Sequence, residues 1–423
     1  MFQPTRRGIL LGAANLGATA FLRPAIAQTP PDFRLGALYP ESGPLALIGQ
    51  ESFRGLELAV EARNAAGGVQ GRRIVLYRRN AQNPGQASQA ARQLMSAERV
   101  AAVFGTAASP LAVPASVAAE LQGVPYFELG APSDALTLRG DRFVFRSAAT
   151  ASAEAALTVR ACMRLLPELW STPLAQLRVF LLHEGGAYGQ NVALVQEALL
   201  RQGLGPVAAG RFAYPAAALP EQNPNPAADY PAIVQRMRDT KPDVVLHSGY
   251  PAEAQALFAA MRGANWAPRM LIGTATGYGM RDTADAIGAD VEGVMVVGPA
   301  PYAVGGPLAA AAATWAERYA ARHGQPPRSG YSLQDALGAS VFLEALHRAG
   351  STDRERIRDA VLAMRGTDAG FPFEVDGSGQ NRLAQPVLSQ WQAGPEGPRL
   401  VAIAPEPAAL APPAPRMVLI SSP

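Results

Sequence analysis

From residue 33 onward, short apolar runs alternate with segments in which apolar residues recur every three or four positions. The runs are typical of buried strands, and the longer spacing is typical of helices with one buried face. In the segment 51–66, for example, Phe53, Leu56 and Val60 share one face, and a glycine pair ends the pattern. The strands expected in this first part lie at 33–39, 73–77, 100–104 and 124–129, and the helices at 51–66, 86–97 and 109–122.

The same alternation returns after a helical stretch near 151–166. Because parallel strands need crossover helices, this repetition predicts an α/β protein with parallel sheets covered by helices on both faces. Two sheets of about five strands each suit the chain length better than one very large sheet. The strands expected here lie at 178–182, 243–247 and 270–272, and the helices at 190–202, 230–239 and 252–262.

The pattern changes after a strand expected at 291–297. Three helical segments follow without a strong strand between them, at 307–323, 331–349 and 353–364. Residues 371–375 and 386–391 then predict a closing antiparallel pair, joined by a turn at 376–379. The last segment, 401–423, contains six prolines, so we expect an extended, poorly ordered tail there.

The first 27 residues have the pattern of an export signal. Arg6 and Arg7 precede an uncharged run from Gly8 to Leu22, and an Ala-x-Ala motif ends at Ala27. The run is too short and too rich in glycine and alanine for a good membrane span. An N-terminal anchor or an ordinary helix is the alternative, and the cleavage motif argues against both. We therefore expect a twin-arginine signal over 1–27, cleavage after Ala27 and a periplasmic protein.

The basic surplus of the chain lies in this leader. The chain carries 37 Lys and Arg against 34 Asp and Glu, a formal net charge of +3, and the leader holds Arg6, Arg7 and Arg23 without any acid. The remainder is therefore neutral overall, whereas a nucleic-acid-binding protein of this size would normally carry a basic surplus on its folded part. No nucleic-acid partner is expected.

Few catalytic chemistries are open to this chain. Lys241 is its only lysine and Cys162 its only cysteine, which leaves no P-loop, no intrachain disulfide and no cysteine-based zinc site. The histidines lack metal-ligand spacing and no GxSxG motif is present, so neither cofactor nor metal is predicted. His183 and His247 could still face each other across neighbouring strand ends as an acid–base pair or a weak metal site, which would suit an exported hydrolase.

Two loops that follow expected strands combine small residues with hydroxyl groups. In open parallel sheets ligands bind beyond the carboxyl ends of the strands, where free amides and the Ser109 hydroxyl could meet an anion at a helix N-terminus. Simple helix capping by Ser109 and ordinary turn chemistry are the alternatives. The candidate binding residues are Ala107 and Ser109 in the first loop, and Gly130, Ala131 and Ser133 in the second.

Two tyrosines stand just past strand ends in the second half of the chain. Tyr188 and Tyr250 are each flanked by glycine. Aromatic rings from a second sheet would suit an apolar ligand and would offer phenol hydroxyls as polar partners. The alternative is that both are ordinary surface tyrosines.

These loops, in this order, resemble the branched-chain-amino-acid-type solute-binding proteins of ABC transporters. The likeness runs from about 33 to 394, and its most specific parts are the asparagine–glycine segment and the Tyr-Gly-Gln segment. The matching stretches are 38–50, 55–60, 64–72, 187–190, 242–245 and 249–250.

The resemblance implies the type I periplasmic-binding-protein fold, with two doubly wound parallel-sheet lobes joined by three crossovers and closing on a small ligand. Lobe 1 would comprise 33–148 and about 302–370, and lobe 2 would comprise 149–301 and about 371–400. Carried over by position, the ligand-binding residues would be Ala107, Ser109, Gly130, Ala131, Ser133, Tyr188, Tyr250 and Ala275, with Tyr39, Glu41 and Leu47 on the first-strand loop.

Two departures from the family pattern bear on the ligand. Pro132 stands where the family usually has a threonine, and the stretch 273–277 lacks the acid that pairs with an amino acid's ammonium group. An unpaired ammonium in a closed site would be costly, although Glu41 or Glu184 could substitute. The ligand is therefore expected to keep a carboxylate or a similar polar head, without having to be an α-amino acid.

The partners implied are a small-molecule ligand and the permease and ATPase subunits of an ABC transporter. The protein itself is expected to be a monomer and not an enzyme. A periplasmic ligand-sensing protein that works with a signalling partner is the alternative within the binding class.

Overall fold

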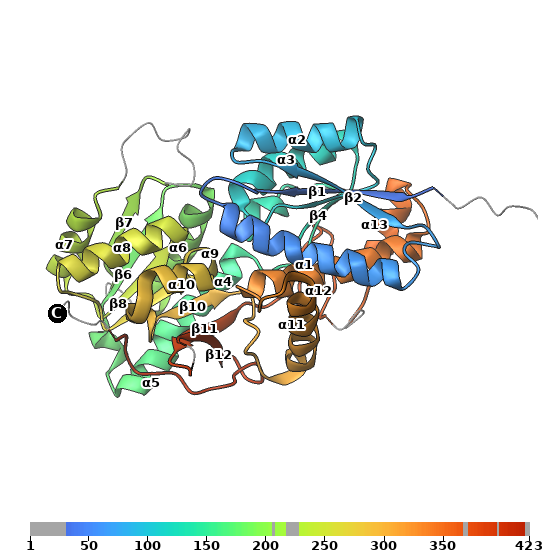
Figure 1. Ribbon diagram of the computed structural model, residues 1–423. Coiled ribbons are helices and arrows are strands. Elements are labelled where there is room, and N and C mark those ends of the chain that lie inside the picture. The colour runs from blue at the N-terminus through green and yellow to red at the C-terminus, as the bar shows by residue number, and fades with distance from the viewer. Residues whose placement is uncertain (1–30, 205–207, 217–227, 367–370, 396, 419–423) are drawn as a thin grey trace, which may run out of the picture.

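The computed structural model describes residues 31–204, 208–216, 228–366, 371–395 and 397–418, which form two sheets with their covering helices (Figure 1). The first sheet is parallel throughout, in the order β2-β1-β3-β4-β5. The second has the order β12-β11-β10-β9-β8-β6-β7 and is parallel except at β11 and β12. The prediction of an α/β fold with two largely parallel sheets is therefore confirmed, with five and seven strands.

We refer to the first sheet and its helices as lobe 1. Ring stacking of Phe127 on Phe342, with centroids 4.3 Å apart, places α12 on one face of this sheet. In Figure 1, α2 and α3 lie on the other side of β1 from α1 and α12. The strands are β1 (Phe33–Tyr39), β2 (Ile74–Asn80), β3 (Val103–Gly105), β4 (Tyr126–Glu128) and β5 (Val144–Arg146). The helices are α1 (Ala46–Ala65), α2 (Pro84–Ser96), α3 (Ser109–Gln122), α11 (Ala309–His323), α12 (Gly330–Ala349) and α13 (Arg354–Ala363).

The second sheet and its helices form lobe 2. Its strands are β6 (Val179–Glu184), β7 (Ala208–Tyr214), β8 (Val244–Ser248), β9 (Met270–Thr274), β10 (Met295–Gly298), β11 (Val387–Gln392) and β12 (Arg399–Ala404). Its helices are α4 (Ala151–Arg160), α5 (Leu166–Trp170), α6 (Ala187–Leu204), α7 (Tyr230–Thr240), α8 (Pro251–Gly263), α9 (Ala275–Tyr278) and α10 (Arg281–Ile287). The sequence pattern did not predict β5, β7 or β12. β5 is only three residues long, and the alanines and glycine of β7 do not give the apolar pattern that is typical of a strand.

The predicted antiparallel pair of 371–375 with 386–391 is wrong. β11 pairs instead with β10, where Met295 faces Gln390, and with β12, where Gln390 faces Val401. Residues 371–375 contribute only an isolated bridge from Val375 to Asn381 across the predicted turn. The turn was placed correctly, but hydrophobic pattern alone does not say which strand a segment pairs with.

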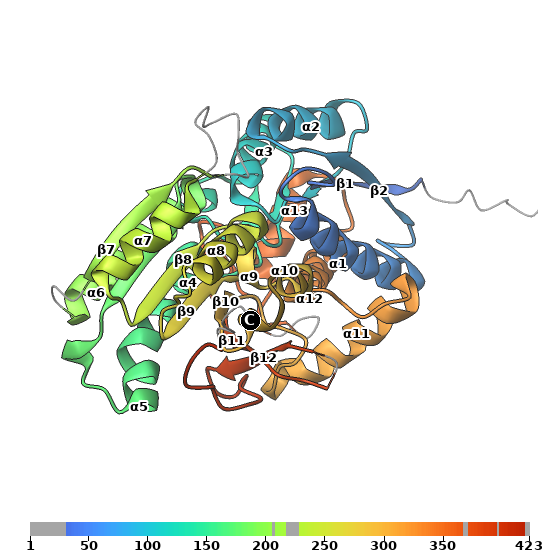
Figure 2. The ribbon, with the colours of Figure 1, turned by 60° about the vertical axis from the view of Figure 1, so that its left-hand side comes forward.

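The expectation of a poorly ordered tail is also wrong for 401–418. Part of it forms β12, which Figure 2 shows beside β11, and the rest runs over lobe 2. Gly305 N–H donates to the Ala408 carbonyl at 2.8 Å, and the Trp170 ring N–H donates to the Pro415 carbonyl. Proline lacks an N–H but keeps its carbonyl acceptor, so a proline-rich segment can still be anchored by donors from elsewhere. Residues 419–423 lie outside the described part.

The chain passes between the lobes after β5, after β10 and before β11. Across the described ranges, none of the helices combines the length and the apolar character needed to cross a membrane. The predicted leader, 1–27, lies outside the described residues.

Candidate ligand-binding site

Most of the predicted binding residues lie where strands end and helices begin. In lobe 1, Tyr39 ends β1, Ser109 opens α3 after β3, and Gly130 comes two residues after the end of β4. In lobe 2, Tyr188 lies in the first turn of α6, and Tyr250 comes between β8 and α8. Carboxyl ends of parallel strands share one edge of a sheet, so each sheet collects its own candidates there. Ala275 likewise opens α9 directly after β9.

Ser109 joins the two loops of lobe 1 and does not cap its own helix. The N-cap position of α3 is Ala108, without a side-chain hydrogen bond, and the buried Ser109 Oγ accepts from the Ser133 N–H at 3.1 Å. The loops also touch at Gly130, where an added Cβ would lie 3.0 Å from the Ala107 Cα. The small residues at these positions therefore permit a close approach of the two loops.

Glu128, the last residue of β4, is a central residue of this site that sequence reasoning missed. Its Oε1 accepts from the backbone N–H groups of Ala107, Gly130 and Ala131, at 3.1, 3.0 and 2.8 Å. Its Oε2 accepts from the Thr106 N–H at 2.7 Å and from the Tyr126 hydroxyl at 2.9 Å. Burial raises the pKa of Glu128, while the amide hydrogen bonds act in the opposite direction. Three of the amides expected to face a ligand thus already bind a carboxyl group of the protein.

The carbonyl groups of the second loop bind Arg146, the last residue of β5. The buried guanidinium donates to the carbonyls of Ala131 and Ser133 at 3.2 and 2.6 Å, and to the Thr137 hydroxyl at 3.1 Å. Burial lowers the pKa of Arg146 to about 10. The second loop is therefore held through its amides by an acidic side chain and through its carbonyls by a basic one. The sequence signal that could have identified Glu128 and Arg146 is a charged residue at the end of a short apolar run.

The three candidates near β1 have different environments. The Tyr39 hydroxyl is buried and donates to Asp335 Oδ2 of α12 at 3.0 Å. Asp335 Oδ1 is buried without a hydrogen-bond partner among the described residues, and a Cβ on Gly130 would lie 3.5 Å from it. Burial raises the pKa of Asp335 well above its usual value. Glu41 instead pairs with Arg78 at 2.8 Å, in a half-exposed position.

Leu47, the third candidate of this loop, lies in α1 with 36% of its surface exposed. Tyr39 therefore reaches the two small-residue loops through Asp335, whereas Glu41 and Leu47 lie further out.

Tyr188 and Tyr250 are not surface tyrosines. Both are buried, with ring centroids 6.4 Å apart, and the Tyr188 hydroxyl donates to Glu154 Oε2 of α4 at 3.0 Å. Burial is the main cause of the raised pKa of both phenols, and Tyr331 of α12 adds to it in each case. Glu154 is thus a further member of this cluster that sequence reasoning missed. Tyr331 is buried in α12, a helix of lobe 1, and is close enough to affect the pKa of both phenols, so groups from both lobes lie near each other here.

A direct contact between the lobes lies beside these residues. The Asp134 N–H, in the second loop of lobe 1, donates to Asn191 Oδ1 of α6 at 3.1 Å. The Asn191 amide group in turn donates to Asp134 Oδ2 at 3.4 Å. The two lobes therefore meet next to Ser133 and Tyr188.

The carboxyl groups proposed as ammonium partners already have other partners. Glu41 pairs with Arg78, and Glu184 accepts from the N–H groups of Gly186 and Gly189 at the start of α6. In the stretch after β9, hydroxyls replace the missing acid. Thr274 and Thr276 bond each other at 2.9 Å, and Thr276 donates to the Gly249 carbonyl at 2.8 Å.

The two histidines do not form an acid–base pair. The His247 ring nitrogens are hydrogen-bonded to the hydroxyls of Tyr214 and Tyr278, and burial lowers its pKa to about 3. His183 bonds the Glu184 carbonyl at 2.8 Å and accepts from Arg211 at 3.0 Å. Among the described residues there is also no cluster of three or more His, Cys, Asp or Glu that could hold a metal.

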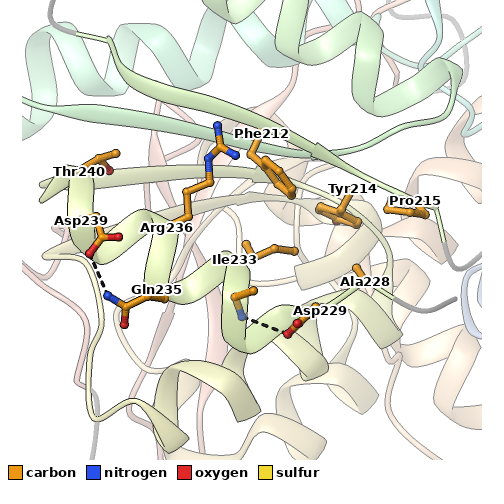
Figure 3. A pocket seen from close by; sticks show the side chains of 11 residues that line it. Phe212, Tyr214, Pro215, Ala228, Asp229, Ile233, Gln235, Arg236, Asp239 and Thr240 are labelled. Atoms are coloured by element: carbon orange, nitrogen blue, oxygen red, sulfur yellow. Dashed lines mark hydrogen bonds between the residues drawn. The ribbon is translucent and has the colours of Figure 1, made fainter. Parts of the chain in front are cut away.

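Two hollows lie away from the predicted binding residues, and none of those residues lines either one. One, of about 620 Å³, lies between β7 and α7, where Phe212 and Arg236 project into it (Figure 3). It borders Pro215 and Ala228, and residues 217–227 between these two lie outside the described part. The other, of about 290 Å³, is lined by all three inter-lobe connections and by Pro405 and Pro407 of the C-terminal segment.

Comparison with known proteins agrees with this architecture. A Leu/Ile/Val-binding protein homolog 7 from Brucella abortus is 36% identical over 399 residues, covering 93% of this chain and 96% of that protein. Homolog 8 from Brucella suis is 36% identical over 410 residues, covering 96% of each chain.

Solved structures show the same fold at low identity. The branched-chain amino acid transporter substrate-binding protein LivJ from Streptococcus pneumoniae, in complex with isoleucine, has a TM-score of 0.73 at 18% identity, covering 88% of this chain and 100% of that one. A solute-binding protein from R. palustris, in complex with 4-hydroxybenzoate, has a TM-score of 0.75 at 17% identity, covering 88% and 96%.

The pattern of the periplasmic binding protein family matches residues 32–392, nearly the whole described chain. This match confirms the resemblance, and with it the expectation of a substrate-binding protein in place of an enzyme. The type I fold, the two identified relatives and the family match agree, and the chain belongs to the periplasmic binding protein family.

Proposed function

We propose that this protein is exported by its twin-arginine leader, cleaved after Ala27, and captures a small solute between its lobes for delivery to an ABC permease and ATPase. Support comes from the relatives, which are named Leu/Ile/Val-binding protein homologs, and from ABC-transporter proteins of the same fold. The buried Tyr188, Tyr250 and Tyr331 would contact the solute from both lobes.

We infer further that the solute is a small organic acid or amide and need not be an α-amino acid. The observation that carries this inference is the engagement of Glu41 by Arg78 and of Glu184 by the α6 amides. Glu154, which bonds Tyr188, has its pKa raised to about 8 by burial, so it is largely neutral near pH 7. An ammonium group would therefore meet no ready carboxylate among these three, and burying it unpaired would be costly.

A thermal-shift screen followed by calorimetry tests both statements. A ligand that binds the native state raises the melting temperature in proportion to the logarithm of its excess over Kd. We expect shifts from hydroxybenzoates, branched-chain keto acids or aliphatic amides that exceed those from leucine, isoleucine and valine. Tight leucine or valine binding that is lost in Glu41→Ala would reverse the inference about the ligand. A ligand-sensing role would be favoured if the gene lay beside a sensor kinase and not beside permease and ATPase genes.

A further inference from the structure

We propose that Glu128 is a built-in anion of lobe 1, which occupies the amide cluster formed by the two small-residue loops and positions these loops for the ligand. The ligand then meets the loops through neutral hydrogen-bonding groups, and not through a carboxylate held by these amides. The second statement rests on the proposed function, whereas the first does not.

The neighbours of Glu128 fit an ionised carboxylate. Four backbone N–H groups, from Thr106, Ala107, Gly130 and Ala131, and the Tyr126 hydroxyl all donate to its two oxygens. Four of these five donors are backbone N–H groups, which cannot accept a hydrogen bond, so the acceptor-only form satisfies this environment best. Charge-assisted hydrogen bonds of this kind are stronger than neutral ones.

The strand geometry explains why Glu128 can reach both loops. Successive side chains of a strand point to opposite faces. Phe127 stacks on Phe342 of α12, so Tyr126 and Glu128 share the other face. Phe127 of β4 pairs in register with Phe104 of β3, so Glu128 at the end of β4 lies next to the end of β3. Its side chain therefore lies where the loops after both strands begin.

Arg146 places the opposite charge beside the second loop. It binds the Ala131 and Ser133 carbonyls of the loop whose Ala131 amide binds Glu128. The second loop is fixed by a buried pair of opposite charges, without a ligand. Such preorganisation reduces the ordering cost of binding.

The fixed loops leave particular groups for a ligand. The amides of Ala107, Gly130 and Ala131 already donate to Glu128. The Ser109 oxygen accepts from the Ser133 N–H, which leaves the hydroxyl proton of Ser109 able to donate to a ligand. A ligand carboxylate placed here would also lie near the Glu128 carboxylate, and like charges in a buried site are unfavourable. An amide, hydroxyl or carbonyl group avoids this repulsion.

Chemical rescue tests the role of Glu128 directly. Glu128→Ala empties the position of the carboxylate and leaves four N–H groups around a small cavity. We expect this variant to melt well below the wild type and to be stabilised by sodium acetate, by roughly 2–4 °C more than by sodium chloride at equal ionic strength. Wild type should show no such difference between acetate and chloride.

Two further variants make the rescue specific. Glu128→Gln fills the same space without a charge, so it should be destabilised but not rescued by acetate. Glu120→Ala removes a partly exposed carboxylate that accepts from the Arg142 and Phe143 N–H groups, and should likewise show no preference for acetate. If Glu128→Ala folds only when refolded in acetate, that result supports the proposal. A Glu128→Gln protein as stable as wild type, or equal effects of acetate and chloride on Glu128→Ala, would overturn it.

The ligand statement has its own measurement. Calorimetry on wild type with isovaleramide against isovalerate, and with benzamide against benzoate, should show at least a tenfold preference for the amide where either member binds. A preference for the carboxylates would reject the neutral-group statement and leave the acetate result standing. Binding of neither pair, together with binding of valine, would reject the proposed ligand class and leave the role of Glu128 intact.

Discussion

The Tyr188 hydroxyl donates a hydrogen bond to Glu154 Oε2 at 3.0 Å, in an environment whose burial raises the pKa of Glu154 to about 8. The folded protein therefore holds a proton on Glu154 that the unfolded chain releases near pH 4.3. A carboxyl group with a raised pKa in the folded state stabilises the fold most at low pH. That contribution is lost as the pH rises through the folded-state value.

Glu154→Gln should remove this pH dependence. Between about pH 5 and 8, the free energy of unfolding of wild type should fall relative to that of the variant, by at most about 1.4 kcal/mol per pH unit. Urea unfolding of both proteins at several pH values measures the difference. Parallel curves across this range would show that Glu154 titrates normally in the folded protein.

Tyr188→Phe should destabilise the protein by about 1–2 kcal/mol, because it leaves the buried Glu154 carboxyl without its donor. Tyr77→Phe is a suitable control, since Tyr77 is partly buried and its ring contact with Arg34 survives the change. Chemical unfolding measures both variants. Equal stability losses would mean that the Tyr188 hydrogen bond contributes nothing particular.

Asn191→Ala should weaken binding of any ligand that the screen identifies by about two- to fivefold, because a hydrogen bond worth about 0.5–1 kcal/mol is lost between the lobes. The partners it loses are the N–H group and the carboxylate of Asp134. Gln190→Ala, at the neighbouring position of α6, is the control. Calorimetry that gives the same Kd for wild type and Asn191→Ala would show that this contact does not assist closure.

Ending the chain after Gln392 should cost several kcal/mol of stability, whereas ending it after Val418 should have little effect. The longer deletion removes the buried Val401, Ile403 and Met417, and burial of such a side chain contributes about 1.5–3 kcal/mol. It also exposes the edge of β11. Thermal and urea unfolding compare the two truncations, and equal stability would contradict a structural role for this segment.

The local hydrophobic pattern was sufficient to predict an element whose formation depends on burying one face. The stripe of Phe53, Leu56 and Val60 predicted a helix that the structure has as α1. Strand ends and small-residue loops likewise indicated where Ser109 and Tyr188 would lie. Parallel strands converge at one sheet edge whatever their detailed packing, so those positions follow from the order of elements along the chain.

Tertiary structure alone decided the pairing of β11 with β10 and β12, and the partners of the charged groups. Nothing local to Glu128 says that amides from two separate loops will surround its carboxyl group, and nothing local to Arg146 says which carbonyls it will bind. Tyr331 is 143 residues from Tyr188 in the sequence, and only the packing of the lobes brings them together. The sequence by itself determined the class of fold and the strand ends where the predicted binding residues lie. The three-dimensional packing decided which polar groups there remain free for a ligand, because hydrogen bonding depends on distances between segments that the linear order does not contain.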